Sequence, residues 1–186
     1  YKEKRDSIGK MTVTPSLIQK AEDLVNKLKS CDTTQYYANM KPEEGKSDVC
    51  NELAILFEHD GVEYKAMLDK IEVNHVDKYI QPLDWKTSYD VAEPKYNYLK
   101  FGYYLQASLY DYALEQWAKE NGMQNYEIKP MTYIFCDTSG FADPVVLTLN
   151  EHDISAGWNG FKIRGYEYRG LRDIMNDIAW HVESGI

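Results

Sequence analysis

Apolar residues recur at helical spacing in three segments of the chain. Residues 15–29 predict a first helix, with Thr14 and Pro15 forming a typical helix start. Residues 93–122 predict a long second helix that begins near Pro94 and stops at Asn121-Gly122. Residues 171–185 predict a third. The expected apolar faces of the three helices are Leu17, Ala21, Leu24, Val25 and Leu28; Leu99, Tyr103, Gln106, Tyr110, Ala113 and Trp117; and Leu171, Ile174, Met175, Ile178 and Val182.

Between the first two helices the pattern changes to the alternation that is typical of β-strands. Asp60-Gly61 separates two such runs, residues 52–58 and 62–73, and predicts a hairpin. A third run covers 79–88, although Pro82 is unusual inside a strand. Two more strands are expected at 131–138 and 144–150, and residues 30–50 look like polar loop. This order predicts the α/β class, with a mixed central β-sheet flanked by helices.

The length of 186 residues suits one domain, residues 1–186, with a core of its own. The chain begins with Tyr rather than Met, so we expect a fragment that lacks upstream N-terminal residues. Residues 1–10 are charged and do not resemble a secretory signal, and no apolar run approaches the ~18 residues of a membrane span. Three widely spaced cysteines without a zinc motif fit reduced thiols in a cytoplasmic protein.

The net charge of −9 argues against a protein that coats nucleic acid by bulk electrostatics. An enzyme with a local basic groove, or one that meets DNA through bound cations, remains compatible with it. Residues 160–172 interleave basic and aromatic side chains, a combination that suits single-stranded nucleic acid. A solvated loop that leads into the last helix explains the same residues. They are Lys162, Arg164, Arg169 and Arg172 with Phe161, Tyr166 and Tyr168.

Two aspartates and a lysine lie late in the second and third predicted strands. Asp69 and Asp84 can converge on one cation if these strands are neighbours, and alternation sends Lys86 to the same face as Asp84. The carbonyl of Trp85 would add a further hard oxygen ligand, as Mg²⁺ favours. Lys86 would then orient the attacking water or add positive charge at a phosphate. A solvated ion pair between Asp84 and Lys86 is the alternative.

These residues resemble the signature of the PD-(D/E)xK nuclease superfamily, whose restriction-endonuclease-like core matches the predicted fold. "MLD" and, after it, "LDWKTS" carry the resemblance, although Leu68 stands where the family usually has Pro. The block from Asn51 to Trp117 resembles more specifically the RecE and lambda-exonuclease-like recombination nucleases and the RecB-type nuclease domains, which also share the helical motif Q-x-x-x-Y, here Gln106 to Tyr110.

The resemblance implies a Mg²⁺- or Mn²⁺-dependent DNA exonuclease of phage or prophage recombination. It also implies a bacterial or phage-infected cytoplasm, a single-strand annealing protein as partner, and a homo-oligomer, since some relatives form rings. Such families carry a further metal ligand on an upstream helix, for which Glu22 is the candidate and Glu52 a weaker one. Gln106 and Tyr110 would position substrate, or simply contact each other one helical turn apart.

Two other functions fit the same residues. A nuclease-like fold can persist as a binding or scaffold module that lacks catalysis, and the acidic composition agrees with that. A structure-specific endonuclease would keep the chemistry and change the substrate.

Overall fold

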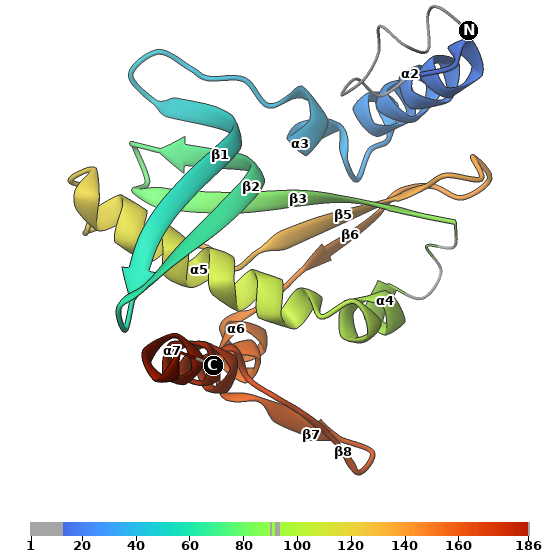
Figure 1. Cartoon of the computed structure of the whole chain (residues 1–186). Coiled ribbons are helices and arrows are strands. Elements are labelled where there is room, and N and C mark those ends of the chain that lie inside the picture. The colour runs from blue at the N-terminus through green and yellow to red at the C-terminus, as the bar shows by residue number, and fades with distance from the viewer. Residues whose placement is uncertain (1–12, 90, 92–93, 186) are drawn as a thin grey trace, which may run out of the picture.

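The computed structural model describes residues 13–89, 91 and 94–185 (Figure 1). The opening segment 1–10 and Glu93, the first residue of the predicted long helix, lie outside the described residues. The helices are α2 (Pro15–Ser30), α3 (Gln35–Asn39), α4 (Pro94–Lys100), α5 (Tyr103–Glu120), α6 (Glu151–Asn159) and α7 (Leu171–Ser184). The strands are β1 (Ser47–His59), β2 (Val62–Asn74), β3 (Tyr79–Ser88), β4 (Glu127–Ile128), β5 (Thr132–Asp137), β6 (Val145–Thr148), β7 (Phe161–Ile163) and β8 (Tyr166–Tyr168).

A mixed sheet forms the centre of the fold, as predicted. Its strands follow the order β1-β2-β3-β5-β6, with β4 beside β3. The first three strands form an antiparallel meander, β3 is parallel to β4 and β5, and β6 is antiparallel to β5. The change from antiparallel to parallel pairing therefore occurs at β3, the strand that carries Asp84 and Lys86.

Helices flank the sheet on both sides (Figure 1). Helix α5 crosses one face, where Ala107, Ala113 and Leu114 join the core with Ile71 and Val73 of β2. Helices α6 and α7 pack against α5 beyond it (Figure 1). On the other side, helix α3 meets β2, since the Lys70 ammonium donates to the Tyr37 carbonyl and the Tyr36 hydroxyl donates to Glu72.

The predicted hairpin is confirmed. Asp60 and Gly61 both have positive φ, 49° and 73°, as a two-residue type I′ turn requires. His59 pairs with Val62, and the ladder extends to Ser47 opposite Asn74. Both strands are thus longer than the sequence indicated, and β1 begins inside the segment that was expected to be loop. Pro82 is accommodated in β3, opposite Ile71.

The prediction of one continuous helix over residues 93–122 was wrong. The chain forms α4 and α5, which are separated at Phe101-Gly102. Gly102 has φ 66°, a left-handed conformation that a helix interior does not contain and that glycine adopts at little cost. Leu99 therefore belongs to α4 and does not share the face of α5 that covers the sheet.

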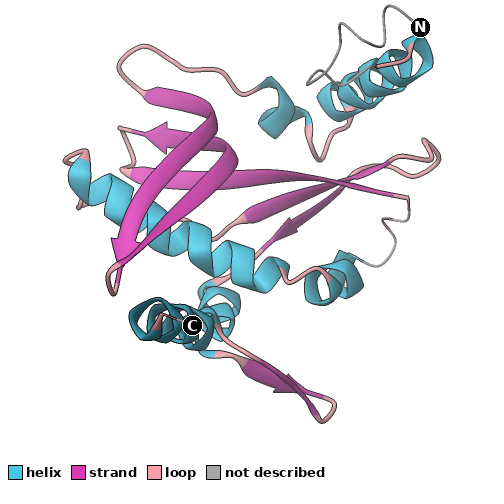
Figure 2. Cartoon of the chain, in the orientation of Figure 1, coloured by secondary structure: helices cyan, strands magenta, loops and turns pink. Residues whose placement is uncertain are grey.

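Several short elements were not predicted from the sequence. Helix α6 begins with a capping box, in which Asn150 and Asp153 each accept from the other's backbone N–H. The hairpin β7–β8 forms where a loop was the alternative, and Figure 2 shows it projecting away from the central sheet. The predicted inward face of α7 is only partly correct: Leu171 and Met175 are buried, whereas Val182 is exposed. None of the described helices has the length and apolar character that crossing a membrane requires.

Candidate functional site

The register between β2 and β3 brings the two predicted aspartates together. The paired residues run from Asn74 opposite Tyr79 to Lys70 opposite Leu83. Continued by one residue, this register places Asp69 opposite Asp84, and side chains at opposed positions lie on the same face of a sheet. The strand order and the shared face agree with the geometry that the sequence predicted.

Lys86 completes this group. Its Nζ lies 2.6 Å from Oδ2 of Asp84, and both side chains are largely buried. The same ammonium lies over two aromatic rings, 4.7 Å from the ring centroid of Tyr103 and 5.6 Å from that of Tyr133. A cation over the faces of two rings gains electrostatic stabilisation from each. The lysine is therefore held from two sides, by a carboxylate and by an aromatic pair.

Asp69 contacts β3 through the backbone of Trp85. The Trp85 N–H donates to Oδ2 of Asp69 at 2.9 Å. In an extended strand the N–H and C=O of one residue point toward the same neighbouring strand. The Trp85 carbonyl consequently faces the gap between β2 and β3, on the side of Asp69. A cation held by the two carboxylates would require a carbonyl ligand in this orientation.

The ladders on both sides of β2 are interrupted at Asp69. Toward β3, the pairing ends at Lys70. Toward β1, Asn51 pairs with Lys70 and Leu53 with Leu68, but Glu52, which the register places opposite Asp69, has φ 53° and is left out of the ladder. Positive φ is uncommon for a residue with a side chain and is found preferentially at functional sites. This irregularity sets Asp69 apart from the rest of the strand.

Asp84 is buried in a manner that is costly for a carboxylate. Its side chain is 2% exposed, and burial raises its pKa to about 6, while the Lys86 ammonium opposes that rise in part and Asp69 adds to it. Its Oδ2 lies 2.6 Å from the Lys86 ammonium and has no other partner among the described residues. A buried carboxylate is strongly disfavoured unless a cation compensates it, and here Lys86 supplies part of that compensation.

These residues fit a hard divalent cation. Mg²⁺ is commonly held by one or two carboxylates, with waters and substrate phosphate completing its shell. Asp69, Asp84 and the carbonyl of Trp85 supply oxygen ligands of that kind. No set of three or more His, Cys, Asp or Glu side chains within the described ranges gathers closely enough to hold a metal ion.

A third acidic side chain is consequently not gathered with Asp69 and Asp84 among the described residues. Glu22 lies exposed on α2 and does not join the two aspartates. Glu52 is also exposed, and it forms no three-residue cluster with them. The sequence argument placed Glu22 by its helix alone, and a helix position does not specify where that helix packs.

Gln106 and Tyr110 contact each other, which was the alternative to a role in substrate binding. The Gln106 side-chain amide donates to the Tyr110 hydroxyl at 3.0 Å, and that hydroxyl donates to the Met67 carbonyl at 2.5 Å. Tyr110 is buried, so it ties α5 to β2 two residues before Asp69. Direct contact of either residue with a substrate stays a prediction.

Tyr103 and Tyr133 were not predicted as members of this group. The Tyr133 hydroxyl donates to the Tyr103 carbonyl at 2.8 Å, and the two rings stack with centroids 5.4 Å apart. Tyr133 is opposite Asp84 in the parallel ladder of β3 and β5. Alternation in the apolar run 131–138 could have placed Tyr133 and Phe135 on one face, but the parallel neighbour of that run could not be read from the sequence.

The basic and aromatic residues of 160–172 lie on and beside the β7–β8 hairpin. Phe161 stacks on Tyr168 with centroids 4.9 Å apart, and Tyr104 of α5 meets both rings edge-on. Lys162 pairs with Glu167 across the hairpin at 3.5 Å. Arg169 pairs with Asp177 of α7 at 2.6 Å. These contacts assign much of the segment a packing role, and nucleic-acid binding by it stays a prediction.

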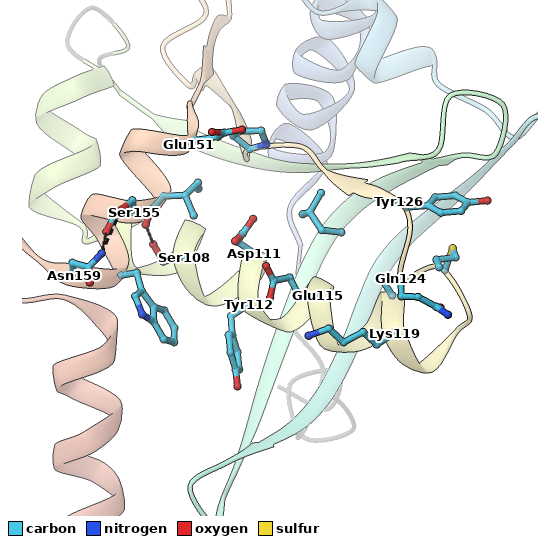
Figure 3. Close-up of a pocket in the computed structure, with 16 residues that line it drawn as sticks. Ser108, Asp111, Tyr112, Glu115, Lys119, Gln124, Tyr126, Glu151, Ser155 and Asn159 are labelled. Carbon is cyan, nitrogen blue, oxygen red and sulfur yellow. Dashed lines mark hydrogen bonds between the residues drawn. The ribbon is translucent and has the colours of Figure 1, made fainter.

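A cavity of about 700 Å³ lies on the opposite side of α5, between this helix and α6 (Figure 3). Asp111 and Glu115 lie side by side along its wall, with Ser108 and Ser155 near α6 (Figure 3). Burial, and secondarily the charge of Glu115, raises the pKa of Asp111 to about 6. The cavity shares no lining residue with the Asp69–Asp84–Lys86 group, so the two are separate features.

Comparison with known proteins gives a structural match. No protein-family model matches the chain. No curated protein matches it. The chain is similar to a crystal structure from Eubacterium rectale that bears the name "Putative exonuclease", with a TM-score of 0.60 and 11% sequence identity, covering 99% of this chain and 60% of that one. The chain thus spans about 60% of the length of that solved protein. At this identity the likeness establishes the fold alone, a mixed α/β fold.

Proposed function

We propose that this chain is a divalent-metal-dependent nuclease whose centre consists of Asp69, Asp84 and Lys86, with the carbonyl of Trp85. The observation that carries the proposal is the convergence of three ionisable groups between β2 and β3. Asp69 reaches the Trp85 N–H at 2.9 Å, and Asp84 reaches Lys86 at 2.6 Å. A carboxylate and a lysine that are both largely buried are costly to desolvate, and such pairs are found preferentially at functional sites.

Asp69, Asp84 and the Trp85 carbonyl would hold Mg²⁺ or Mn²⁺. The bound cation supplies charge to neutralise the phosphate and lowers the pKa of water. Lys86 adds a positive charge at a position that Asp84, Tyr103 and Tyr133 hold in place. A preorganised cation stabilises the charge that develops on a phosphodiester in the transition state. The low exposure of Asp84 and Lys86 strengthens that interaction, because little water screens it.

The finer assignment is a DNA exonuclease of phage or prophage recombination. Three features support it: the D-x-K-T/S strand at Asp84, the Q-x-x-x-Y helix at Gln106, and the name of the Eubacterium rectale protein. DNA would be the substrate, and a single-strand annealing protein and further copies of the chain would be its partners. A cytoplasmic location in a bacterial or phage-infected cell belongs to the same proposal.

Digestion of linear duplex DNA with Mg²⁺ or Mn²⁺ tests the assignment. We expect Asp84→Asn and Lys86→Ala to reduce digestion by at least about a hundredfold, the scale on which preorganised charges act. Lys129→Ala is the matched control, because Lys129 also forms a 2.6 Å ion pair, with Glu127, but at an exposed position. Undiminished digestion by both Asp84→Asn and Lys86→Ala would overturn the mechanism.

A comparison of linear with closed circular DNA distinguishes an exonuclease from an endonuclease. An exonuclease degrades linear duplex and leaves covalently closed circles intact, whereas a structure-specific endonuclease cuts circles that contain a suitable branch or bubble. Cleavage of closed circular DNA at the rate of linear DNA would remove the exonuclease version and leave the metal centre in place.

A scaffold module without catalysis is the second candidate. The absence of a third acidic ligand from the described residues favours it, because a two-carboxylate centre binds a cation more weakly than a three-carboxylate one. Calorimetric titration with Mn²⁺ distinguishes the two. Saturable binding that Asp84→Asn abolishes supports the nuclease, and the lack of any Mn²⁺ binding supports the scaffold.

A further inference from the structure

Exposed aromatic side chains gather where α4 meets α5, close to the proposed centre. Tyr96 is 62% exposed and Phe101 is 57% exposed. The ammonium of Lys100 lies between them, 5.6 Å from the ring centroid of Tyr96 and 5.1 Å from that of Phe101. We refer to Tyr96, Lys100 and Phe101 as the aromatic platform. Two large exposed rings that flank a cation are more than the scattered apolar residues of an ordinary surface.

The aromatic platform is continuous with Lys86. The Phe101 ring lies 5.8 Å from the ring of Tyr103, measured between centroids, and the Lys86 ammonium lies 4.7 Å from the same Tyr103 ring. Tyr103 therefore contacts both Lys86 and Phe101. The Phe101 ring centroid consequently lies no more than about 10.5 Å from the Lys86 ammonium of the proposed centre.

The local backbone explains why Phe101 is available. Its N–H still bonds to the Asn97 carbonyl at 3.0 Å, so Phe101 is held by the last turn of α4. Gly102, with φ 66°, then redirects the chain into α5, whose residues pack on the sheet. The turn places Phe101 outside the packed face while Tyr103, two residues later, points toward Lys86.

We propose that the aromatic platform binds an unpaired nucleobase of single-stranded DNA next to the nuclease centre. This inference rests on the proposed function and specifies the substrate that the centre receives. Every base has a π-face, so stacking on Phe101 or Tyr96 binds without regard to sequence. Lys100, whose ammonium lies over both rings, would pair with a phosphate of the bound strand.

The charge of the chain favours stacking over bulk electrostatics as the source of affinity. With a net charge of −9, the protein repels a polyanion at long range. Binding that depends on stacking and on one local lysine responds only weakly to salt. Binding through many phosphate contacts falls steeply with salt. A shallow salt dependence of single-strand binding is therefore part of the inference.

Fluorescence anisotropy with a short labelled single strand tests the platform in EDTA, where no metal supports hydrolysis. We expect Phe101→Ala to weaken binding roughly tenfold, the scale of one lost base stack, and Phe101→Tyr to retain it. Phe141→Ala is the matched control, because Phe141 is 93% exposed in the loop between β5 and β6. Circular dichroism of each variant verifies that it is folded.

A strand with one abasic position adds a second measurement. If a base stacks on Phe101, the abasic strand binds the parent about as weakly as the intact strand binds Phe101→Ala, and the two changes together cost little more than either. Failure of the parent to bind any single strand would overturn the inference. Equal loss in Phe141→Ala, or no loss in Phe101→Ala, would do so as well.

The outcomes separate the platform from the proposed nuclease activity. Phe101-dependent binding without DNA digestion in Mg²⁺ leaves the platform standing and removes the catalytic assignment. Metal-dependent digestion with a Phe101→Ala variant that binds single strands normally does the reverse.

Discussion

The buried carboxylate of Asp84 makes a quantitative prediction about metal binding. Burial raises the pKa of Asp84 to about 6, so a cation that binds there below that pH must displace a proton. At pH 7 about nine-tenths of such groups are ionised, and at pH 5 about one-tenth. We therefore expect Mn²⁺ affinity to fall roughly tenfold between pH 7 and pH 5. An aspartate with an ordinary pKa near 3.9 would be ionised throughout that range.

Replacing Lys86 should shift the pH at which the Mn²⁺ affinity falls. Its ammonium lowers the pKa of Asp84, so Lys86→Met removes that opposition and shifts the midpoint of the Mn²⁺ affinity curve to higher pH. Lys129→Met removes a lysine with the same 2.6 Å separation from its carboxylate, but at an exposed position, and should leave the midpoint unchanged.

Calorimetric titration of Mn²⁺ at pH 5, 6, 7 and 8 measures the effect, and a thermal shift provides an independent readout. Since a ligand at 100 times its Kd stabilises the folded state by about 2.7 kcal/mol, the rise in Tm at a fixed Mn²⁺ concentration should shrink as the pH falls. An affinity that stays constant from pH 5 to pH 7 would refute the argument. So would an equal midpoint shift in Lys86→Met and Lys129→Met.

The raised pKa of Asp84 also predicts how the free energy of unfolding of the metal-free chain depends on pH. An acid with a raised pKa holds its proton more tightly in the folded state than in the unfolded state. Asp84 therefore lowers the free energy of unfolding as the pH rises from about 4 to about 6, and its effect is constant above that window. Bound metal at neutral pH offsets this loss, because it compensates the ionised carboxylate.

Three further predictions concern other parts of the structure. Burial raises the pKa of Asp111, in the cavity between α5 and α6, to about 6. Asp111→Asn should therefore raise the free energy of unfolding by about 3 kcal/mol at pH 8 and by less than about 1 kcal/mol at pH 4, as urea denaturation can measure. A Cβ on Gly157 would lie 2.2 Å from Ser108 Oγ. Because of this clash, Gly157→Ala should lower the free energy of unfolding by about 3 kcal/mol. A Tm within 1 °C of the parent would contradict this prediction. Tyr103→Leu removes one of the aromatic rings that the Lys86 ammonium contacts. If the roughly 1 kcal/mol of cation–π energy that holds Lys86 is lost in the transition state, kcat on duplex DNA falls roughly fivefold. A digestion assay at saturating metal measures this change.

The secondary structure was easiest to predict where local chemistry decides it. Asp60-Gly61 specifies the β1–β2 hairpin because few other residue pairs adopt positive φ twice in succession. Thr14 and Pro15 start α2 as predicted, and the Thr14 side chain accepts from the Leu17 N–H. The long predicted helix was wrong because helical periodicity continues on both sides of Gly102, and the left-handed turn there depends on how α4 and α5 pack.

In the candidate site, too, the features set by local sequence were predicted and those set by packing were not. That Asp84 and Lys86 share a face follows from the two-residue period of any strand, and the three-strand meander is enough to bring Asp69 beside them. Tyr133 could not be assigned from sequence, because its position depends on the parallel pairing of β3 with β5, two segments separated by α4 and α5. Glu22 was assigned by its position on an upstream helix, and in the structure it is exposed and forms no three-residue cluster with the two aspartates.

The sequence by itself determined the alternation of apolar and polar residues, the hairpin turn and the spacing of the two aspartates and the lysine. These depend on conformational preferences of a few neighbouring residues. Only the tertiary structure decided that Asp84 is buried, that Tyr103 and Tyr133 lie beneath the Lys86 ammonium, and that Phe101 remains exposed. Burial and ring contacts arise when segments distant in the chain exclude water together, and no local pattern encodes which segments those are.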